Sequence, residues 1–363
     1  KKTHDVIVNV VLRMTMQTGC IAQGRSASSA RFRFALRTLK SRACENLHVS
    51  NSLPPQSSFS TYVVTTHPGA EGFLQEELAE ILPGVETLAR RGSVEFRAQP
   101  GAMHRVNLWT RSGIRVLEKV REVPLDPDSA AGDTIYEAIR EAMPWGDWLD
   151  SPNKSFSIDV GVAALAPAHQ HVPTLSLALR APLVHKARIW NNSNFSNSQL
   201  VQRRGRDAIC DAVRQTTGHR PLPPPKGRVP ELPLSVTVFE DKLTLYLDTS
   251  GQSLHKRGFK TKIHKAGLNE CAAATMLRMA GFQRMLRDQE ERAEAGDVEG
   301  IITLVDPFCG SGTILSEAAL IAGNIAPGLY RRFWPFLTWP TFDARAKTSW
   351  DGANGHAKAS RRT

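Results

Sequence analysis

The stretch Ile301–Ala322 (IITLVDPFCGSGTILSEAALIA) constrains the fold more than any other part of the chain. It opens with five apolar residues, and a run of this length and β-branched content is typical of a buried parallel strand. Pro307 removes a backbone donor and ends the strand. The apolar residues from Ile314 onward recur with a helical period. A strand, a glycine turn and a helix in this order predict the first unit of a doubly wound α/β domain, which binds its ligand over the helix N-terminus.

The turn itself limits the choice of ligand. A dinucleotide fingerprint needs a third glycine where this chain has Leu315, and a phosphate-binding loop needs a lysine that the turn lacks. S-adenosylmethionine remains, because Gly310 and Gly312 would let the backbone approach its methionine moiety. Asp306, at the end of the strand, is placed to accept a hydrogen bond from the cofactor's ammonium group. A tight turn that binds no ligand stays open as the alternative.

Several classes of protein are disfavoured by the rest of the sequence. No stretch offers about 18 uninterrupted apolar residues, so no membrane-spanning helix is predicted. The cysteines form no CxxC pair and no Cys/His spacing suited to zinc, so we expect reduced thiols in an intracellular compartment and no metal site. They are Cys20, Cys44, Cys210, Cys271 and Cys309.

Most of the net charge of +11 comes from residues 1–60, which hold nine Lys/Arg and two acids. The basic composition alone therefore does not establish RNA binding. Serines interleaved with arginines are typical of an organellar transit peptide, so we expect a disordered targeting segment for a chloroplast or mitochondrion. The alternatives are a disordered basic tail of a cytoplasmic protein, or upstream codons read through, since the chain starts at Lys1.

The middle of the chain predicts α+β structure. Residues 61–101 read as strand, helix and two short strands, the beginning of a ferredoxin-like unit. Further helices are expected over 102–112, 134–143 and 198–217, strands over 114–123 and 155–162, and a hairpin over 234–247, with an insertion loop over 163–198.

Two basic stretches are candidate phosphate contacts. The helix over 198–217 carries three arginines on one face, and residues 248–265 combine basic side chains with Phe259 and have no acid after Asp248. The alternatives without a binding role are a solvated helix face for the first stretch and a solvated linker for the second. The candidate RNA-binding residues are Arg203, Arg204, Arg206, His255, Lys256, Arg257, Lys260 and Lys262.

The motif DPFCGSGTILSEAALIA, with IAPGL and RRFWPF behind it, closely resembles the THUMP-containing RNA methyltransferases. The resemblance is best to the RlmL-like, bacterial-type 23S rRNA guanine-N2-methyltransferase group. LDTSGQSLHKRGFK resembles the segment that joins THUMP to the methyltransferase there, and LNECAAATML the helix that follows. The resemblance covers about residues 62–345.

The resemblance implies a ferredoxin-like unit over 61–101, an RNA-binding THUMP domain over 102–249 and a Rossmann-like methyltransferase domain over 250–343. It implies S-adenosylmethionine as cofactor and RNA as partner. The cofactor pocket would be lined by Asp306, Pro307, Cys309, Gly310, Ser311, Gly312 and Thr313.

The chain departs from that family in one place. Those enzymes hold the extruded target base with an Asn/Asp-Pro-Pro-Tyr/Phe tetrad, which this sequence lacks. Only 51 residues follow Gly312, too few for the rest of the domain, and residues 344–363 look like a disordered tail. We therefore expect an incomplete methyltransferase domain and name no catalytic residue.

The sequence favours an S-adenosylmethionine-dependent rRNA guanine-N2 methyltransferase with an α+β part followed by an α/β part. Two alternatives stay open. The chain could be a non-catalytic THUMP RNA-binding protein, or the enzyme could act on tRNA or on adenine.

Overall fold

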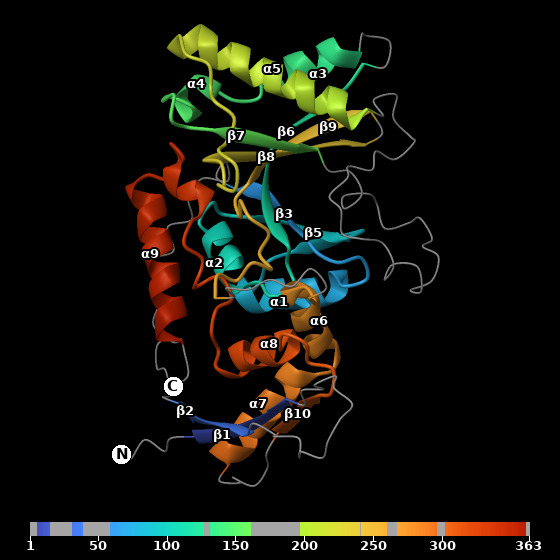
Figure 1. The fold of residues 1–363 in the computed structure, drawn as a ribbon, viewed down its shortest axis with the longest axis vertical. Coiled ribbons are helices and arrows are strands. Elements are labelled where there is room, and N and C mark those ends of the chain that lie inside the picture. The colour runs from blue at the N-terminus through green and yellow to red at the C-terminus, as the bar shows by residue number, and fades with distance from the viewer. Residues whose placement is uncertain are drawn as a thin grey trace, which may run out of the picture.

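The computed structural model describes residues 6–14, 31–38, 59–126, 131–160, 197–239, 241–259, 267–295 and 302–360. The described chain forms stacked layers along its long axis (Figure 1). Two helices, α3 and α5, lie at one end over a seven-stranded sheet, and α1, α2 and the α6–α8 layer follow toward a three-stranded sheet at the other end. The long C-terminal helix α9 runs along one side.

The large sheet has the order β4-β5-β3-β6-β9-β8-β7, and every neighbouring pair is antiparallel except β7 and β8. Its strands are β3 (Ser60–Thr65), β4 (Thr87–Arg90), β5 (Ser93–Ala98), β6 (Arg115–Pro124), β7 (Phe156–Val160), β8 (Leu232–Phe239) and β9 (Lys242–Asp248).

The first half of this sheet is the predicted ferredoxin-like unit, but the unit is longer than expected. Helices α1 (Glu71–Ile81) and α2 (Ala102–Trp109) alternate with β3 to β6 in the order βαββαβ. The predicted boundary after residue 101 is therefore wrong, because α2 and β6 complete the unit and β6 pairs directly with the central strand β3.

The second half is another α+β unit that shares the sheet. Its helices are α3 (Ala131–Arg140), α4 (Trp145–Trp148) and α5 (Ser198–Thr217). The helix predicted over 198–217 and the hairpin predicted over 234–247 are confirmed here as α5 and the β8–β9 pair. Strand β9 also pairs with β6 and so joins the two units edge to edge. The insertion loop expected over 163–198 lies outside the described residues, apart from its last two.

The remaining layer contains the strand that opened the sequence analysis. Strand β10 (Ile302–Asp306) pairs in parallel with β1 (Val6–Met14), which pairs in turn with β2 (Arg31–Thr38). The layer's helices are α6 (Glu270–Met279), α7 (Phe282–Glu294) and α8 (Thr313–Ala322).

The two N-terminal strands correct the expectation that residues 1–60 are disordered throughout. The run VIVNVVLRM is rich in β-branched residues, and RFRFALRT alternates basic and apolar residues with the period of a strand. Overall composition concealed this local pattern.

The two larger apolar cores of the described residues divide the molecule differently from the chain order. The smaller of the two joins α6, α7 and α8. The larger one lies between the seven-stranded sheet and its helices, and it includes residues from the chain's far end, among them Trp334, Phe336, Trp339 and Trp350. After α8 the chain therefore returns to the ferredoxin-like unit, where Gly328 N donates to the carbonyl of Leu108 at 2.9 Å.

The end of the chain corrects a second expectation of disorder. Residues Ala344–Ala359 form α9, whose Asp343 cap accepts a hydrogen bond from Ala346 N at 2.8 Å. Its buried residues Trp350 and Ala357 lie seven positions apart, so they share one face of the helix. Because this face packs on an existing aromatic cluster that includes the 3-10 turn Pro335–Thr338, a tail with few apolar residues is enough to form an ordered helix.

None of the helices within the described ranges combines the length and hydropathy needed to cross a lipid bilayer.

The return of the chain requires a glycine at position 328. A Cβ there would lie 2.8 Å from Asn107 O and 2.9 Å from Leu108 Cα, both backbone atoms that cannot move aside. We expect Gly328→Ala to lower the free energy of unfolding by about 1–3 kcal/mol, measured by urea titration. Gly355→Ala is the matched control: α9 has open space there, and alanine should add about 0.5–1 kcal/mol through helix propensity. Equal effects of the two variants would contradict this account.

His104 makes stability depend on pH. Its ring is 1% exposed, packs against Phe336 at 4.9 Å between centroids, and burial lowers its pKa to about 4. Below the ordinary value of about 6.5 the unfolded chain binds a proton that the folded chain rejects, so stability falls as pH drops from about 6.5 to about 4. The loss is on the order of 3 kcal/mol at most.

We expect His104→Phe to make this pH dependence shallower, measured as urea midpoints across that range. Some dependence should remain, because burial also lowers the pKa values of His67 and His255. An unchanged slope in the variant would show that His104 does not carry the effect.

Candidate cofactor-binding turn

The glycine turn joins the carboxyl end of β10 to the first residue of α8. Gly310 and Gly312 adopt φ angles of 52° and 72°, in the left-handed region that favours glycine. Gly312 N donates to Cys309 O at 2.6 Å and closes the turn. A Cβ on Gly310 would meet nothing nearer than Phe308 O at 4.0 Å, so the space beside this glycine is open for a ligand.

Asp306 supplies the only acid of the turn. Its side chain is 9% exposed, and Oδ1 accepts a hydrogen bond from Phe308 N at 3.1 Å. The carboxylate thus shapes the backbone and keeps a second oxygen that can accept from a ligand's ammonium group. Phe308 is 84% exposed beside it, which is unusual for a large aromatic side chain.

The start of α8 offers the complementary charge. Gly312 is the N-cap residue and has no side chain to satisfy the first-turn N–H groups. The helix dipole and these groups together favour a carboxylate at this position. An amino acid moiety such as the methionine end of S-adenosylmethionine fits a turn that has an acid on one side and a helix N-terminus on the other.

All seven predicted cofactor residues lie between Asp306 and Thr313, but they contribute in different ways. Cys309 and Thr313 are buried below it, and Cys309 packs in the small core with Leu315. Pro307, Gly310 and Ser311 are exposed, and Ser311 Oγ lies 3.3 Å from Thr313 Oγ1. The turn therefore presents backbone to a ligand, while the buried side chains of Cys309 and Thr313 fix it to the small core and to α8.

One buried ion pair attaches α8 to the rest of the molecule. Arg257 Nε lies 3.1 Å from Glu317 Oε1, with side chains 2% and 0% exposed. Arg257 Nη2 also donates to Glu317 Oε2 at 3.2 Å and to Arg111 O at 2.8 Å. Glu317 lies about four residues inside α8, the helix that begins directly after the glycine turn. The ion pair therefore sets the position of the glycine turn relative to the ferredoxin-like unit.

This pair is not predicted from the sequence, although the sequence contains a hint of it. Glu317 interrupts an apolar helix face between Ile314 and Ile321, and a buried carboxylate needs a partner. The spacing could not say which of many arginines it would meet.

Arg111 and Cys271 make further contacts across the same interface. Arg111 Nη2 donates to Ile325 O at 2.9 Å, and its backbone N donates to Glu77 Oε1 at 2.6 Å. Cys271 Sγ donates to Gly113 O at 3.0 Å, and burial raises the pKa of the thiol to about 12. The thiol therefore stays protonated and acts as a hydrogen-bond donor, not as a nucleophile.

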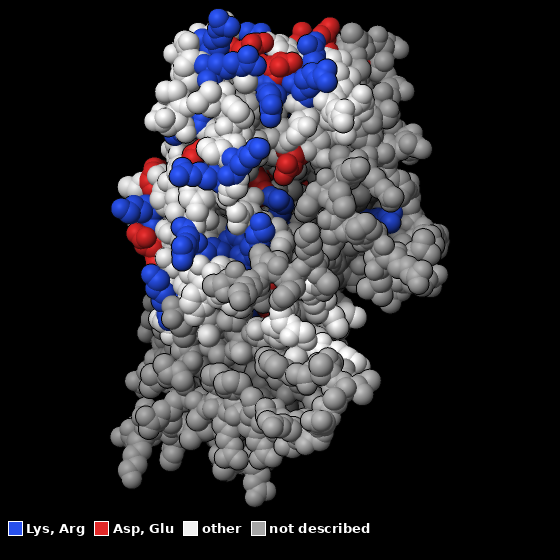
Figure 2. Space-filling view, in the orientation of Figure 1, with Lys and Arg blue, Asp and Glu red and all other residues white. Residues whose placement is uncertain are grey.

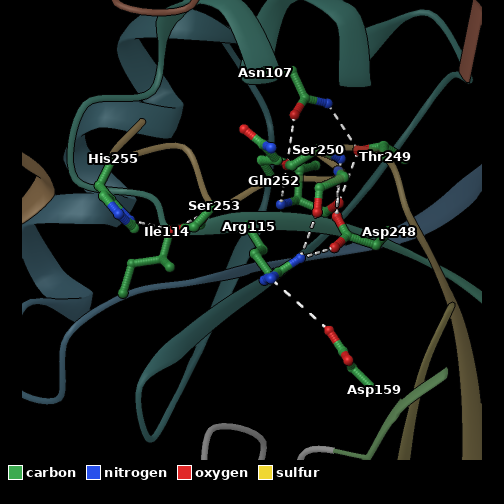
Figure 3. A network of polar contacts seen from close by, with 12 residues as sticks. Asn107, Ile114, Arg115, Asp159, Asp248, Thr249, Ser250, Gln252, Ser253 and His255 are labelled. Carbon is green, nitrogen blue, oxygen red and sulfur yellow. Dashed lines mark hydrogen bonds and ion pairs between the residues drawn. The ribbon is translucent and has the colours of Figure 1, made fainter. Parts of the chain in front are cut away.

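The segment that begins at Asp248 forms a tight polar loop (Figure 3). Asp248 Oδ1 accepts from Ser250 N and Gly251 N, both at 3.0 Å, while Oδ2 pairs with Arg115. Thr249 and Ser250 point toward Asn107 of α2, where Ser250 Oγ donates to its Oδ1 at 2.7 Å. These bonds make the loop a fixed part of the ferredoxin-like unit and not a solvated linker.

Arg331 holds the same loop from the other side. Its Nη2 donates to Ser250 O and Gln252 O, both at 2.8 Å, and its Nη1 donates to Ser253 O at 3.0 Å. The guanidinium also stacks over Trp334 with 4.6 Å to the ring centroid. The sequence analysis assigned no role to this arginine.

These contacts correct part of the predicted RNA-binding strip. Arg257 is buried in its ion pair and cannot reach a phosphate. His255 is half-buried, its Nδ1 lies 2.6 Å from Ser253 Oγ, and burial lowers its pKa, so it adds no charge near neutral pH. Lys256 is exposed and stays a candidate. Lys260 and Lys262 lie outside the described residues.

The arginines of α5 divide in a similar way. Arg204 is ion-paired with Asp133 and lies over the Tyr136 ring at 5.5 Å, so it ties α5 to α3. Arg203 and Arg206 are exposed and stay candidates for phosphate contact. In Figure 2, Lys and Arg gather at the end of the molecule where Figure 1 places α3 and α5, with a few acids among them.

Comparison with protein families identifies two parts of the chain. Residues 61–117 match the model of the RlmL ferredoxin-like domain. Residues 293–360 match the model of the RMKL-like methyltransferase domain. The glycine turn lies inside the stretch that matches the methyltransferase domain.

Curated relatives bear one shared name. The chain is 30% identical over 299 residues to the ribosomal RNA large subunit methyltransferase K/L of Pseudoalteromonas atlantica. It is 31% identical over 278 residues to the protein of that name from Cellvibrio japonicus. The matches cover 82% and 77% of this chain but 35% and 30% of the relatives, so the chain spans about one third of their length.

Solved structures show the same fold. One, from Listeria monocytogenes, is named a predicted N6-adenine-specific DNA methylase; it matches with a TM-score of 0.59 at 24% identity, covering 84% of this chain and 65% of that one. The structure of SMU.472, solved in complex with SAH, matches with a TM-score of 0.57 at 23% identity, covering 84% and 66%. The fold class expected from the sequence, an α+β part followed by a Rossmann-like methyltransferase part, is confirmed.

The buried ion pair should be sensitive to the loss of one partner. Arg257→Met leaves Glu317 charged and buried, so we expect a loss of about 3–5 kcal/mol in the free energy of unfolding. The double variant Arg257→Met/Glu317→Leu should recover part of that loss, because no uncompensated charge remains. Urea titration measures all variants.

The matched control is Arg287→Met, which breaks an exposed pair with Glu80 whose side chains are 58% and 51% exposed. It should change the free energy of unfolding by less than about 1 kcal/mol. If the double variant is no more stable than Arg257→Met alone, the uncompensated charge of Glu317 is not the cause of the loss and this account fails.

Proposed function

We propose that this chain is part of an S-adenosylmethionine-dependent methyltransferase that modifies large-subunit ribosomal RNA, with guanine N2 as the target atom. The observation that carries the proposal is the glycine turn at the end of β10, with an acid on one side and an uncapped helix N-terminus on the other. The names of the curated relatives support ribosomal RNA as the substrate. The specificity for guanine N2 rests on the resemblance of the turn motif to that group of enzymes.

The residues of the chain would bind and orient in this mechanism. Asp306 would accept from the amino group of the cofactor, and the first N–H groups of α8 would face its carboxylate. S-adenosylmethionine, when bound, supplies an activated methyl group. The Arg257–Glu317 pair would hold the turn at a fixed place relative to the RNA-binding surface, and such positioning accounts for much of the rate enhancement in group transfer.

The second α+β unit is proposed to be the THUMP domain that binds RNA. Its helix α5 carries the exposed Arg203 and Arg206, and Lys256 is exposed on the loop that follows the sheet. Transfer RNA as the substrate, or RNA binding without catalysis, would be supported by the outcomes named below.

An organellar location is also proposed, on the composition of residues 1–60. Serine and arginine with few acids suit an import signal. Fusion of these residues to a fluorescent protein would test it: fluorescence in chloroplasts or mitochondria is expected, and diffuse cytoplasmic fluorescence would contradict it.

Cofactor binding is tested at Asp306. Titration calorimetry of the chain with S-adenosylmethionine should give measurable heat, and Asp306→Asn should weaken binding about 10- to 150-fold, because it removes a charge-assisted bond worth about 1.5–3 kcal/mol. The variant keeps an acceptor for Phe308 N, so the turn should fold. Asp351→Asn, exposed on α9, is the control and should bind normally. Absence of heat with cofactor, together with salt-dependent RNA binding, would favour the non-catalytic alternative.

RNA binding is tested on α5. The double variant Arg203→Ala/Arg206→Ala should bind ribosomal RNA fragments more weakly, and the slope of log affinity against log salt should become shallower by about 1.4–1.8. Arg284→Ala/Arg292→Ala, two exposed arginines of α7, form the matched control. If both double variants lose affinity equally, the contact is not specific to α5. Tighter binding to transfer RNA than to ribosomal RNA would overturn the proposed substrate.

A further inference from the structure

A cavity of about 330 Å³ lies between the ferredoxin-like unit and the α6–α8 layer, away from the glycine turn. Its walls come from α1, α2, α7 and the last turn of α6, and from the C-terminal ends of α8 and α9. The bond from Asn324 Nδ2 to Ser360 O, at 3.1 Å, joins the last two of these walls. None of the residues from Asp306 to Thr313 lines the cavity, so it is separate from the candidate cofactor site.

The charged side chains that line the cavity differ in whether they already have a partner within the protein. The buried Glu77 already accepts from Ser112 N at 3.1 Å and from Arg111 N at 2.6 Å. Glu80 is ion-paired with Arg278 at 2.7 Å. The exposed Arg105 has no described ion pair or hydrogen bond. The whole lining holds four arginines (Arg105, Arg111, Arg278 and Arg287) and three carboxylates (Glu77, Glu80 and Glu290), so its formal net charge is +1.

Arg111 is the most informative residue of the lining. It is only 8% exposed, its Nη2 donates to Leu320 O and Ile325 O, and its Nη1 is buried without a hydrogen-bond partner among the described residues. Leaving a charged donor unsatisfied costs about 1–3 kcal/mol or more. An oxyanion in the cavity would supply the missing acceptor.

The cavity also has an aromatic wall. The half-buried Trp109 ring lies 6.1 Å from the ring of His356 between centroids, and both line the cavity. An indole face beside a guanidinium is a combination that binds a flat base next to a phosphate. A volume of 330 Å³ is within the range of small-molecule sites.

We propose that this cavity binds a nucleoside monophosphate group, with the phosphate toward Arg111 and Arg105 and the base against Trp109. The group could be a free nucleotide or one nucleotide of an RNA chain, and the chemistry of recognition is the same. The site would give the protein a second nucleotide contact at the domain interface, distant from α5.

Calorimetry of the chain with GMP, guanosine and inorganic phosphate tests the proposal. GMP should bind with a Kd of about 0.1–1 mM, and each half alone should bind at least about tenfold more weakly. Arg105→Ala should weaken GMP and phosphate about tenfold, whereas Trp109→Leu should weaken GMP but not phosphate. Arg284→Ala, exposed on α7 and outside the lining, is the control and should change nothing.

Arg111→Lys keeps the positive charge but loses the planar guanidinium with its several N–H donors. If the variant folds, it should no longer bind phosphate. If it does not fold, Arg105→Ala and Trp109→Leu still decide the question, because neither side chain is fully buried. Absence of GMP binding, or equal weakening by Arg105→Ala and Arg284→Ala, overturns the proposal. S-adenosylmethionine binding should be the same in the cavity variants as in the parent chain, which separates this site from the proposed function.

A short 5′-phosphorylated RNA distinguishes the two sources of the nucleotide. If the site accepts a nucleotide of RNA, GMP should compete with the oligonucleotide, and Trp109→Leu should weaken both. If only GMP is affected by the variant, the site takes the free nucleotide. Either result supports the site.

Discussion

The structure depends on a guanidinium and a carboxylate that are both removed from water. Arg257 and Glu317 can be buried only because each satisfies the other, and the same arginine also binds the carbonyl of Arg111. Such a pair adds little net stability compared with apolar side chains of the same shape, but it is costly to break. Its value is geometric: the planar, two-pronged contact fixes α8, and with it the glycine turn, in one position against the ferredoxin-like unit.

The path of the chain reinforces this attachment. The α6–α8 layer has its own small core, yet the chain enters it from the loop after β9 and leaves it to rejoin the large core through Trp334 and Trp350. Arg331 lies in the segment that follows α8 and donates to carbonyls of the loop that follows β9. The segments that lead into and out of the α6–α8 layer are therefore bound to each other at one place. A layer anchored at both ends cannot move far from the sheet, so the glycine turn keeps its place relative to the ferredoxin-like unit.

Pairing with carboxylates inside the protein explains why basic residues that are close in sequence have different roles. Arg204 and Arg257 are used inside the protein, where carboxylates neutralise them, whereas Arg203, Arg206 and Lys256 remain on the surface. A stretch of basic sequence therefore overstates the surface available to a phosphate backbone. Arg111 is an intermediate case, because it is buried and yet keeps one unsatisfied nitrogen.

The sequence alone determined the local elements and the cofactor turn. Strand β10, the glycines and α8 were predictable because a short apolar run, a helical period and glycines in a turn are properties of neighbouring residues. The succession of strands β3 to β9 along the chain was predictable for the same reason. Tertiary structure alone decided which charges are buried, where the first unit ends and that the C-terminal residues fold. Arg257 meets Glu317 across 60 positions, and α9 is stable because Trp350 reaches a core built by distant segments. Burial depends on those long-range contacts, and no pattern within a short window contains them.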